Sequence, residues 1–238
     1  IYDTAARQFD LQSRRDTIAG NAIISATDNL DLTFAFNSYQ RTGNMPWGGS
    51  FAFPIGIEMP LVIDNRTTNA SAGVEWASHQ GMFRVAYDYS KFNQNIPTFT
   101  WDNAVRATDY NESPRTVTGY DPSGYSNGNG PATGRMAMAP TNTLATFNWL
   151  GMVKLPNRTT ANGSFSMGAG HQNEALIPWT INPVIANPAL NAAFPGLAAL
   201  PRDTAQMSVN YTTGTFNLNS RPNRYVTLSA RYRFNSRS

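Results

Sequence analysis

The sequence predicts an all-β protein: an antiparallel up-and-down transmembrane β-barrel of about eight strands that form part of a larger barrel. Eight segments of about ten residues alternate apolar and polar side chains with a period of two, as a strand crossing a bilayer does. Short turns and long connections join these segments alternately. Charged residues make up only 14% of the 238 residues and aromatic residues 12%, whereas soluble proteins carry about 25% charged residues.

The segment 224–234 has the clearest alternation. Its two faces are Val226, Leu228, Ala230, Tyr232 and Phe234 against Tyr225, Thr227, Ser229, Arg231 and Arg233. A strand of this length fits a bilayer, because soluble strands are mostly five or six residues long.

We treat 1–238 as a single partial β-barrel domain. The predicted strands are 17–26, 30–41, 68–78, 82–92, 143–153, 159–170, 204–216 and 224–234. Long loops are expected at 43–66, 94–142 and 172–202, and turn-forming residues fill the short gaps between the other strands. This rhythm puts every long loop on one side of the sheet, as in outer-membrane barrels.

Both ends of the sequence look cut. The opening residues 1–7 lack the charged-then-apolar pattern of a signal peptide. The closing residues 235–238 lack the aromatic residue that often ends an outer-membrane barrel. We therefore expect an internal portion of a longer chain. No run of 18 apolar residues is present, which excludes a transmembrane helix from the prediction.

The residue inventory offers little for catalysis or metal binding, so we predict no enzyme. Without cysteine there is no disulfide, thiolate metal site or covalent haem attachment. The two histidines, His79 and His171, are expected at a turn and a strand end. Residues 121–132 begin like a calcium loop, but Ala132 stands where an EF-hand needs a bidentate acid, which leaves only a loop calcium site open. The 18 basic residues form no run, so nucleic-acid binding gains no support.

The alternation also predicts which side chains face the lumen. The candidates for contact with a partner inside the barrel are Asn37, Asn69, Glu75, Arg84, Asp88, Asn148, Ser164, Asn210, Thr227, Arg231 and Arg233. Charges on this side fit two interpretations, a solvated channel wall with charges paired across strands, or a wall shaped to hold a polar protein or to filter ions. Both stay open at this point.

Short motifs recur in a fixed order along nearly the whole chain. They are Arg41-Thr-Gly43, Ser50-Phe51, Pro60 with Asp64-Asn-Arg-Thr67, Tyr87-Asp-Tyr-Ser-Lys-Phe-Asn93, Trp101-Asp-Asn103, Ala139-Pro-Thr-Asn142, Leu155-Pro-Asn-Arg-Thr159, His171-Gln-Asn173, Leu200-Pro-Arg-Asp203, Ser220-Arg-Pro222 and Tyr232-Arg-Phe234. Their order and spacing resemble the outer-membrane barrel family that partners decahaem c-type cytochromes, the MtrB/PioB type.

The resemblance implies a large barrel in the outer membrane of a Gram-negative bacterium, of which this chain supplies an internal part. It implies that the barrel encloses a multihaem c-type cytochrome and lets electrons cross the membrane, with outer-membrane lipid around it. It gives this chain no catalytic residue and no cofactor, since haem is expected only in the partner cytochrome. Two alternatives stay open: a passive or substrate-selective outer-membrane porin, and a soluble β-sandwich binding module.

Overall fold

The structure is a computed structural model that describes residues 8–52, 55–103, 133–178, 181 and 200–238. In this part of the chain, no helix is long and apolar enough to cross a membrane. The strands are β1 (Ser13–Thr27), β2 (Leu30–Ala52), β3 (Ile55–Ala77), β4 (Gly81–Gln94), β5 (Thr98–Asp102), β6 (Thr133–Ala137), β7 (Asn142–Leu155), β8 (Thr159–Gln172), β9 (Met207–Ser220) and β10 (Leu228–Arg237).

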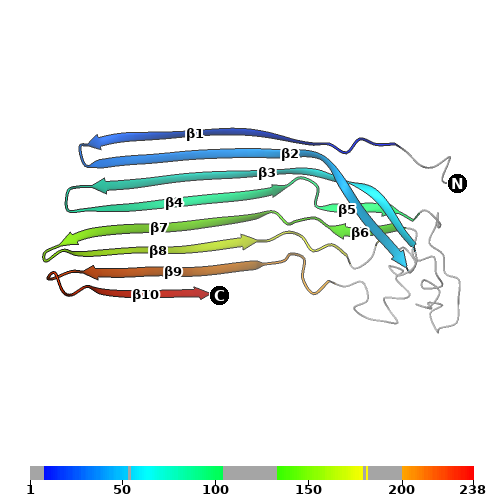
Figure 1. Cartoon of the computed structure of the whole chain (residues 1–238). Helices are drawn as coiled ribbons and strands as arrows, with labels where there is room; N and C mark the ends of the chain where they lie inside the picture. The colour runs from blue at the N-terminus through cyan, green and yellow to red at the C-terminus, as the bar shows by residue number, and fades with distance from the viewer. Residues whose placement is uncertain (1–7, 53–54, 104–132, 179–180, 182–199) are drawn as a thin grey trace.

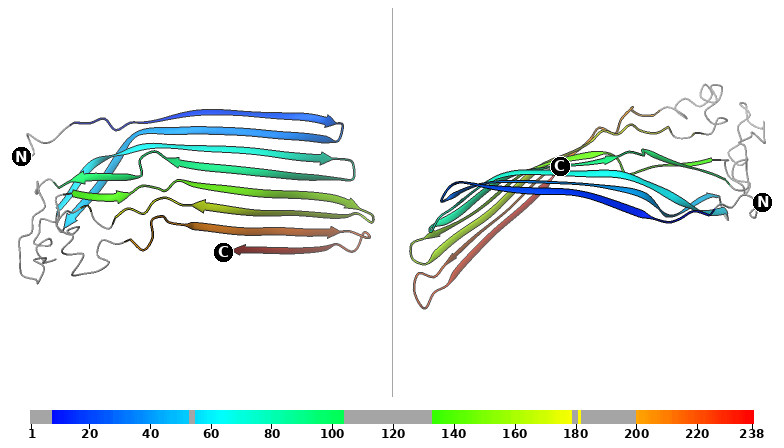
Figure 2. Two further views of the ribbon diagram at one scale, coloured as in Figure 1. Left: turned by 180° about the vertical axis from the view of Figure 1, so that it is seen from behind. Right: turned by 90° about the horizontal axis from the view of Figure 1, so that it is seen from above.

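Eight of these strands form one antiparallel sheet in the order β1-β2-β3-β4-β7-β8-β9-β10, and β5 pairs with β6 in a separate hairpin (Figure 1). This up-and-down order confirms the predicted fold class. Seen from above, the eight strands make a single curved layer (Figure 2). Within the described residues β1 and β10 do not pair with each other, so the barrel is not closed. A single layer contradicts the β-sandwich alternative, which requires two packed sheets.

The four short turns β1–β2, β3–β4, β7–β8 and β9–β10 lie at one end of the sheet, on the left in Figure 1. The long connections from β4 to β7 and from β8 to β9 leave from the other end. In the turn between β7 and β8, Asn157 and Arg158 have φ values of 58° and 52°. Two consecutive residues with positive φ are typical of the turn that matches the twist of a tight hairpin. The connection at the opposite end between β4 and β7 contains the β5–β6 hairpin.

The structure corrects two predicted loops. Residues 43–66 belong mostly to strands, because β2 and β3 stay paired from Gly43 and Ile63 out to Ala52 and Ile55. Their Gly and Pro content suggested a loop, but apolar residues alternate along this stretch, and Pro46 lies opposite Pro60. The predicted loop 94–142 holds the paired β5 and β6.

The last two strands also begin later than predicted. β9 begins at Met207 and β10 at Leu228, against expected starts at 204 and 224. Before β10, Oδ1 of Asn223 accepts hydrogen bonds from the backbone amides of Tyr225 (2.9 Å) and Val226 (3.0 Å). Because these donors are used in the turn, neither residue joins the ladder of the sheet.

Strand pairing assigns each side chain to one of two faces, since residues opposite each other in a sheet point the same way. One face, here called the apolar face, carries the row Phe34, Ala72, Tyr87, Phe147 and Met167. It is solvent-accessible in this single chain, with Tyr87 53% exposed. So large an exposed apolar surface needs an apolar environment.

The other face, here called the polar face, carries the neighbouring row Ala35, Ser71, Asp88, Thr146 and Gly168. On β4 the apolar face extends from Phe83 to Tyr89. Six residue steps of about 3.4 Å give a height of about 20 Å, close to the apolar band of about 25 Å on membrane barrels.

An aromatic row crosses the apolar face toward the short-turn end. Ring centroids are 5.8 Å apart for Trp76 and Phe83, 6.5 Å for Phe83 and Trp149, 6.3 Å for Trp149 and Phe216, and 6.5 Å for Phe216 and Phe234. The row therefore spans strands from β3 to β10. Such a row is typical of the aromatic girdle at a membrane interface.

The outer parts of β2 and β3 leave the plane of the sheet and cross over the β5–β6 hairpin (Figure 1). At this level β1 begins, and the amide of Asn44 donates to the carbonyl of Gln12 at 2.8 Å. Gly43 has a φ of 127°, and a Cβ there would lie 2.1 Å from that same carbonyl oxygen. Only glycine fits this position without strain.

We call these outer parts of β2 and β3, together with β5 and β6, the cap. Met59, Leu61 and Ile63 are only 8%, 6% and 7% exposed. Trp101 of β5 stacks on Phe99 at 5.9 Å and lies close to Gly49 of β2. These side chains are buried because two layers meet here, whereas the wall formed by the eight strands is one layer thick.

Candidate functional site

The candidate functional site is the polar face of the wall. Small residues dominate its centre: Ala19, Ala35, Ser71, Gly73, Ala86, Ser90, Ser164, Ser166, Gly168, Gly170 and Thr213. Larger side chains such as Leu144, Leu150 and Tyr211 stand among these small residues on the same face.

Two shallow hollows lie on the polar face and meet at Asp88. One, of about 490 Å³, is lined by residues that include Asn37, Asn69 and Ser71. The other, of about 340 Å³, is lined by residues that include Arg84 and Asn148. Both are open depressions in a sheet rather than enclosed substrate pockets.

Hydrogen bonds between side chains connect neighbouring strands across this face. Nδ2 of Asn148 donates to Oδ2 of Asp88 at 2.5 Å, which joins β7 to β4. Nδ2 of Asn217 donates to Oδ1 of Asn162 at 2.9 Å, which joins β9 to β8. By contrast, Oδ1 of Asn37 is buried and has no hydrogen-bond partner among the described residues. Side-chain hydrogen bonds thus connect neighbouring strands on this face, and at least one amide oxygen is left without a bond.

Most of the predicted lumen residues share this face. By register, they are Asn37, Asn69, Glu75, Arg84, Asp88, Asn148, Ser164, Arg231 and Arg233. The structure brings Asn37 opposite Asn69 and Glu75 opposite Arg84. Their contact with a partner stays a prediction.

Two predicted lumen residues lie elsewhere. Asn210 pairs with Ala169, which places it in the row of Ala145 and Tyr89 on the apolar face. The prediction rested on the alternation in the first half of β9. In the structure Phe216 pairs with Gly163, and this register decides which face each side chain of β9 lies on. Thr227 precedes β10 and has no partner in the sheet.

Sequence reasoning missed Tyr211, because a lumen position for Asn210 puts its neighbour Tyr211 on the opposite, apolar face. The register puts Tyr211 on the polar face, in phase with Thr213, Thr215 and Asn217. Its hydroxyl lies 2.8 Å from Oγ1 of Thr146 on β7. The polar residues Thr213, Thr215 and Asn217, which alternate with Gly214 and Phe216, could have identified this face from the sequence.

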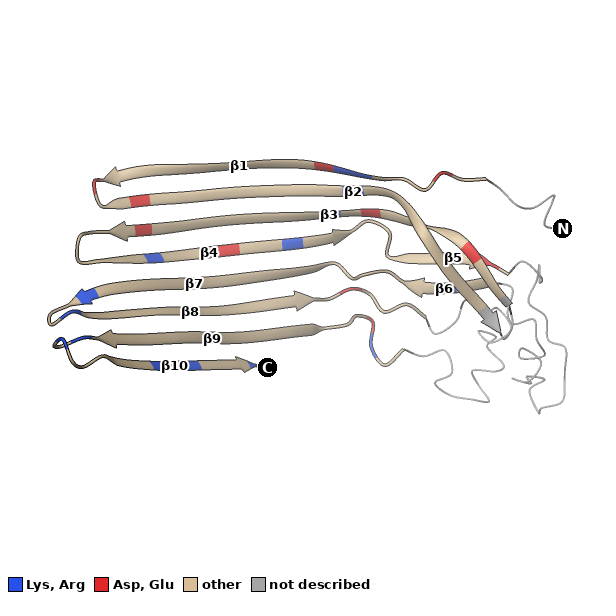
Figure 3. Ribbon diagram, in the orientation of Figure 1, with Lys and Arg blue, Asp and Glu red and all other residues tan. Residues whose placement is uncertain are grey.

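Charged residues are spread unevenly over the strands of the wall (Figure 3). Asp31, Glu75 and Arg84 lie on β2 to β4, and Arg231 and Arg233 on β10. Between them, β8 and β9 contain no Asp, Glu, Lys or Arg. The part of the face formed by β8 and β9, beside β10, is therefore polar without being charged.

No group of three or more His, Cys, Asp or Glu side chains is close enough to hold a metal ion in the described part of the chain. His79 lies in the turn between β3 and β4, and His171 pairs with Thr143 near the outer end of the sheet. The calcium-loop candidates of residues 121–132 lie outside the described residues.

Comparison with known proteins gives one match over the full chain. The family described as "Putative outer membrane beta-barrel porin, MtrB/PioB" matches residues 1–238. No curated protein matches the sequence. The family is one of barrels in the bacterial outer membrane and not a family of enzymes, which agrees with the exposed apolar face, the aromatic row and the up-and-down strand order. The chain belongs to the MtrB/PioB family of outer-membrane β-barrel porins.

Proposed function

We propose that the polar face lines the lumen of a large barrel and encloses a multihaem c-type cytochrome, so that electrons cross the outer membrane inside the protein wall. The observation that carries this proposal is the breadth and smoothness of the polar face. A cytochrome is a folded protein, and enclosing one demands a wide lumen with few protruding side chains.

The breadth follows from the strand count. Eight neighbouring strands leave seven spacings of about 4.8 Å, or an arc of about 34 Å. A barrel closed from eight strands alone has an interior just wide enough for side chains. Because β1 and β10 stay apart here, the arc fits a wider barrel whose lumen can admit a protein domain.

The smoothness separates a protein-lined lumen from a selective pore. Pores that select ions place rings of charged side chains around the channel. Here β8 and β9 carry no Asp, Glu, Lys or Arg, and Ser164, Ser166 and Gly168 give β8 only small side chains on this face. Such a surface suits contact through hydrogen bonds and bridging water with another protein.

The wall needs no redox group of its own for this role. Its backbone groups are paired between strands, so lipid cannot break through to the lumen. Electrons would then move between the haems of the enclosed cytochrome, while the wall keeps lipid and bulk solvent away.

The test is to purify the full-length barrel from the membranes of its native host with an affinity tag and to record its visible spectrum. We expect a Soret band in a fixed ratio to barrel protein and a co-purifying haem-stained band. A pure barrel without haem absorbance that conducts ions in planar bilayers would instead establish the porin alternative.

A further inference from the structure

The apolar face ends in polar rows toward the long connections. Directly beyond Phe36 and Ala70, the hydroxyls of Ser38 and Thr68 lie 3.1 Å apart. The next row pairs Gln40 with Arg66. The environment of this face therefore changes from hydrocarbon to polar groups within a few residues.

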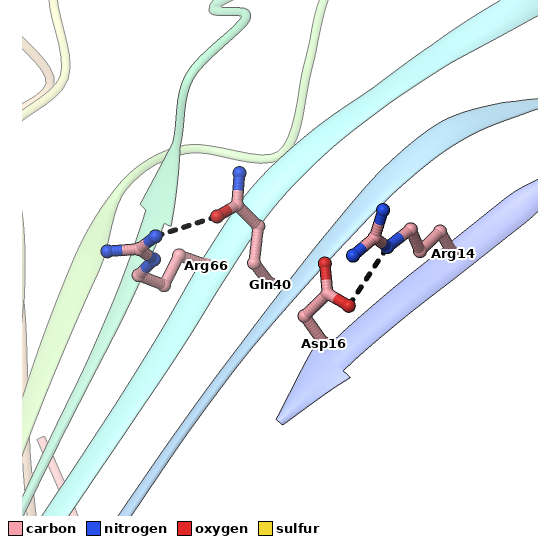
Figure 4. Close-up of polar contacts among 4 residues, drawn as sticks. All are labelled: Arg14, Asp16, Gln40 and Arg66. Atoms are coloured by element: carbon pink, nitrogen blue, oxygen red, sulfur yellow. Dashed lines mark hydrogen bonds and ion pairs between the residues drawn. The ribbon is translucent and has the colours of Figure 1, made fainter. Parts of the chain in front are cut away.

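Arg66 is held in place by a chain of hydrogen bonds. Its Nη2 donates to Oε1 of Gln40 at 2.7 Å (Figure 4). Nε2 of Gln40 donates in turn to Oδ1 of Asp64 at 3.2 Å, and Nδ2 of Asn95 donates to the same oxygen at 2.9 Å. Arg66 is exposed, and one nitrogen of its guanidinium is held by Gln40. A guanidinium carries five N–H donors, so the group has further donors to offer.

Two further cations lie on the same face nearby. Arg14 contacts Asp16 through Nε at 2.9 Å (Figure 4), and their side chains are 77% and 57% exposed. Asp16 pairs with Gln40, so it belongs to the row of Arg66. Lys91 of β4 is exposed and pairs with Thr68, one row nearer the apolar band. We call Arg14, Arg66 and Lys91 the rim cluster.

The height of the rim cluster matches the headgroup region of a bilayer. Lys91 is two residues beyond Tyr89 on β4, and Arg66 is four residues from Ala70 on β3, which corresponds to about 7 and 14 Å along the strands. The hydrocarbon core is about 30 Å thick and the headgroups add several ångströms on each side. Long connections mark the outer surface of such barrels, so this rim meets the outer leaflet.

We propose that the rim cluster binds the phosphate groups of the phosphorylated glycolipid that forms the outer leaflet of the membrane. Guanidinium groups bind phosphate oxygens through paired hydrogen bonds, and lysine adds a point charge. Of the neighbouring acids, Asp64 bonds to the amides of Gln40 and Asn95. Asp16 contacts Arg14 through Nε, so a phosphate would share this guanidinium with Asp16 through its Nη donors. This site is on the outside of the wall and is independent of what fills the lumen.

The chain supplies a matched control at the same height. Arg15 and Arg41 pair with each other on the polar face, one residue from Arg14 and from Gln40 respectively. The guanidinium of Arg15 lies 4.1 Å from the ring centroid of Tyr39. Neutralising these two arginines removes similar charge from the same level of the barrel, but on the side that lipid does not reach.

The experiment titrates purified full-length barrel in detergent with fluorescent diphosphorylated lipid A. We expect the variant Arg14→Gln/Arg66→Gln/Lys91→Gln to bind about 100-fold more weakly, at about tenfold for every one or two basic residues lost. The control Arg15→Gln/Arg41→Gln should bind like the unmodified barrel. Equal binding by both variants, or equal loss in both, overturns the proposal.

A second arm identifies the source of the phosphate. The unmodified barrel should bind monophosphorylated lipid A more weakly than diphosphorylated lipid A. The triple variant should bind the two lipids equally. Millimolar inorganic phosphate should not displace lipid A, and displacement would instead assign a site for free phosphate. If the triple variant fails to show the heat-modifiable migration of a folded barrel, Arg14→Gln/Lys91→Gln carries the test, because it leaves the bonds between Arg66, Gln40 and Asp64 intact.

Discussion

The hydroxyl of Tyr211 lies 2.8 Å from Oγ1 of Thr146, although the two residues belong to β9 and β7, with β8 between them. Tyr211 reaches Thr146 across Gly168, which pairs with both residues in the ladder. A Cβ at Gly168 would lie 2.3 Å from Cε1 of the ring. The flat polar face therefore depends on a glycine that lets one aromatic side chain span a whole strand.

Replacing this glycine tests that dependence. We expect Gly168→Val to displace the Tyr211 ring, break its bond to Thr146 and lower the free energy of unfolding by about 1–3 kcal/mol, the usual cost of overpacking. The measurement is urea unfolding of the full-length barrel in detergent. Gly20→Val on β1 is the control, because a Cβ at Gly20 meets nothing within 4 Å. Equal destabilisation by both substitutions would contradict the proposed role of Gly168.

Two adjacent residues of β2 test the assignment of the faces. Phe34 lies on the apolar face and Ala35 on the polar face. An arginine on the lipid side near the bilayer midplane costs about 2–4 kcal/mol, while lumen positions tolerate charge. We expect Phe34→Arg to reduce folding into lipid vesicles, scored by heat-modifiable migration, and Ala35→Arg to fold normally. If instead Ala35→Arg failed to fold and Phe34→Arg folded normally, the lipid-facing and lumen-facing sides would be assigned the wrong way round.

The two glycines Gly48 and Gly49 test the packing of the cap. A Cβ at Gly49 would lie 2.4 Å from Cε of Met59 and 2.8 Å from Nε1 of Trp101, whereas a Cβ at Gly48 meets nothing within 4 Å. We expect Gly49→Val to separate the two hairpins and to speed proteolytic cleavage within the outer parts of β2 and β3. Gly48→Val should be cleaved at the unmodified rate. Identical digestion patterns for the two variants would argue against a packed cap.

A bulky side chain on the polar face tests the enclosed partner. Ser166 lines the hollow of about 340 Å³, and the adjacent Met167 is exposed on the apolar face. We expect Ser166→Trp to lower the ratio of Soret absorbance to barrel protein in the purified complex. Met167→Trp should leave that ratio unchanged. An unchanged ratio in both variants, each folded, would mean that no partner contacts this part of the wall.

The sequence by itself determined the central parts of the eight strands of the wall and the membrane environment expected for them. Alternation with a period of two is a local property of an extended chain, so each segment reveals which side chains share a face without knowledge of its neighbours. Turn residues likewise mark the tight connections locally. For this reason the antiparallel fold class and the common face of Asn37, Arg84 and Arg231 followed from the sequence.

The tertiary structure decided what depends on pairing between distant segments. β9 contains two conflicting alternations, and only its register with β8 places Tyr211 on the polar face and Asn210 on the apolar one. The sequence predicts a loop for the outer parts of β2 and β3. In the structure they are strands, because they pair with each other and Met59 packs against the neighbouring layer. Register and layer packing are set by contacts between strands, and no single segment carries that information.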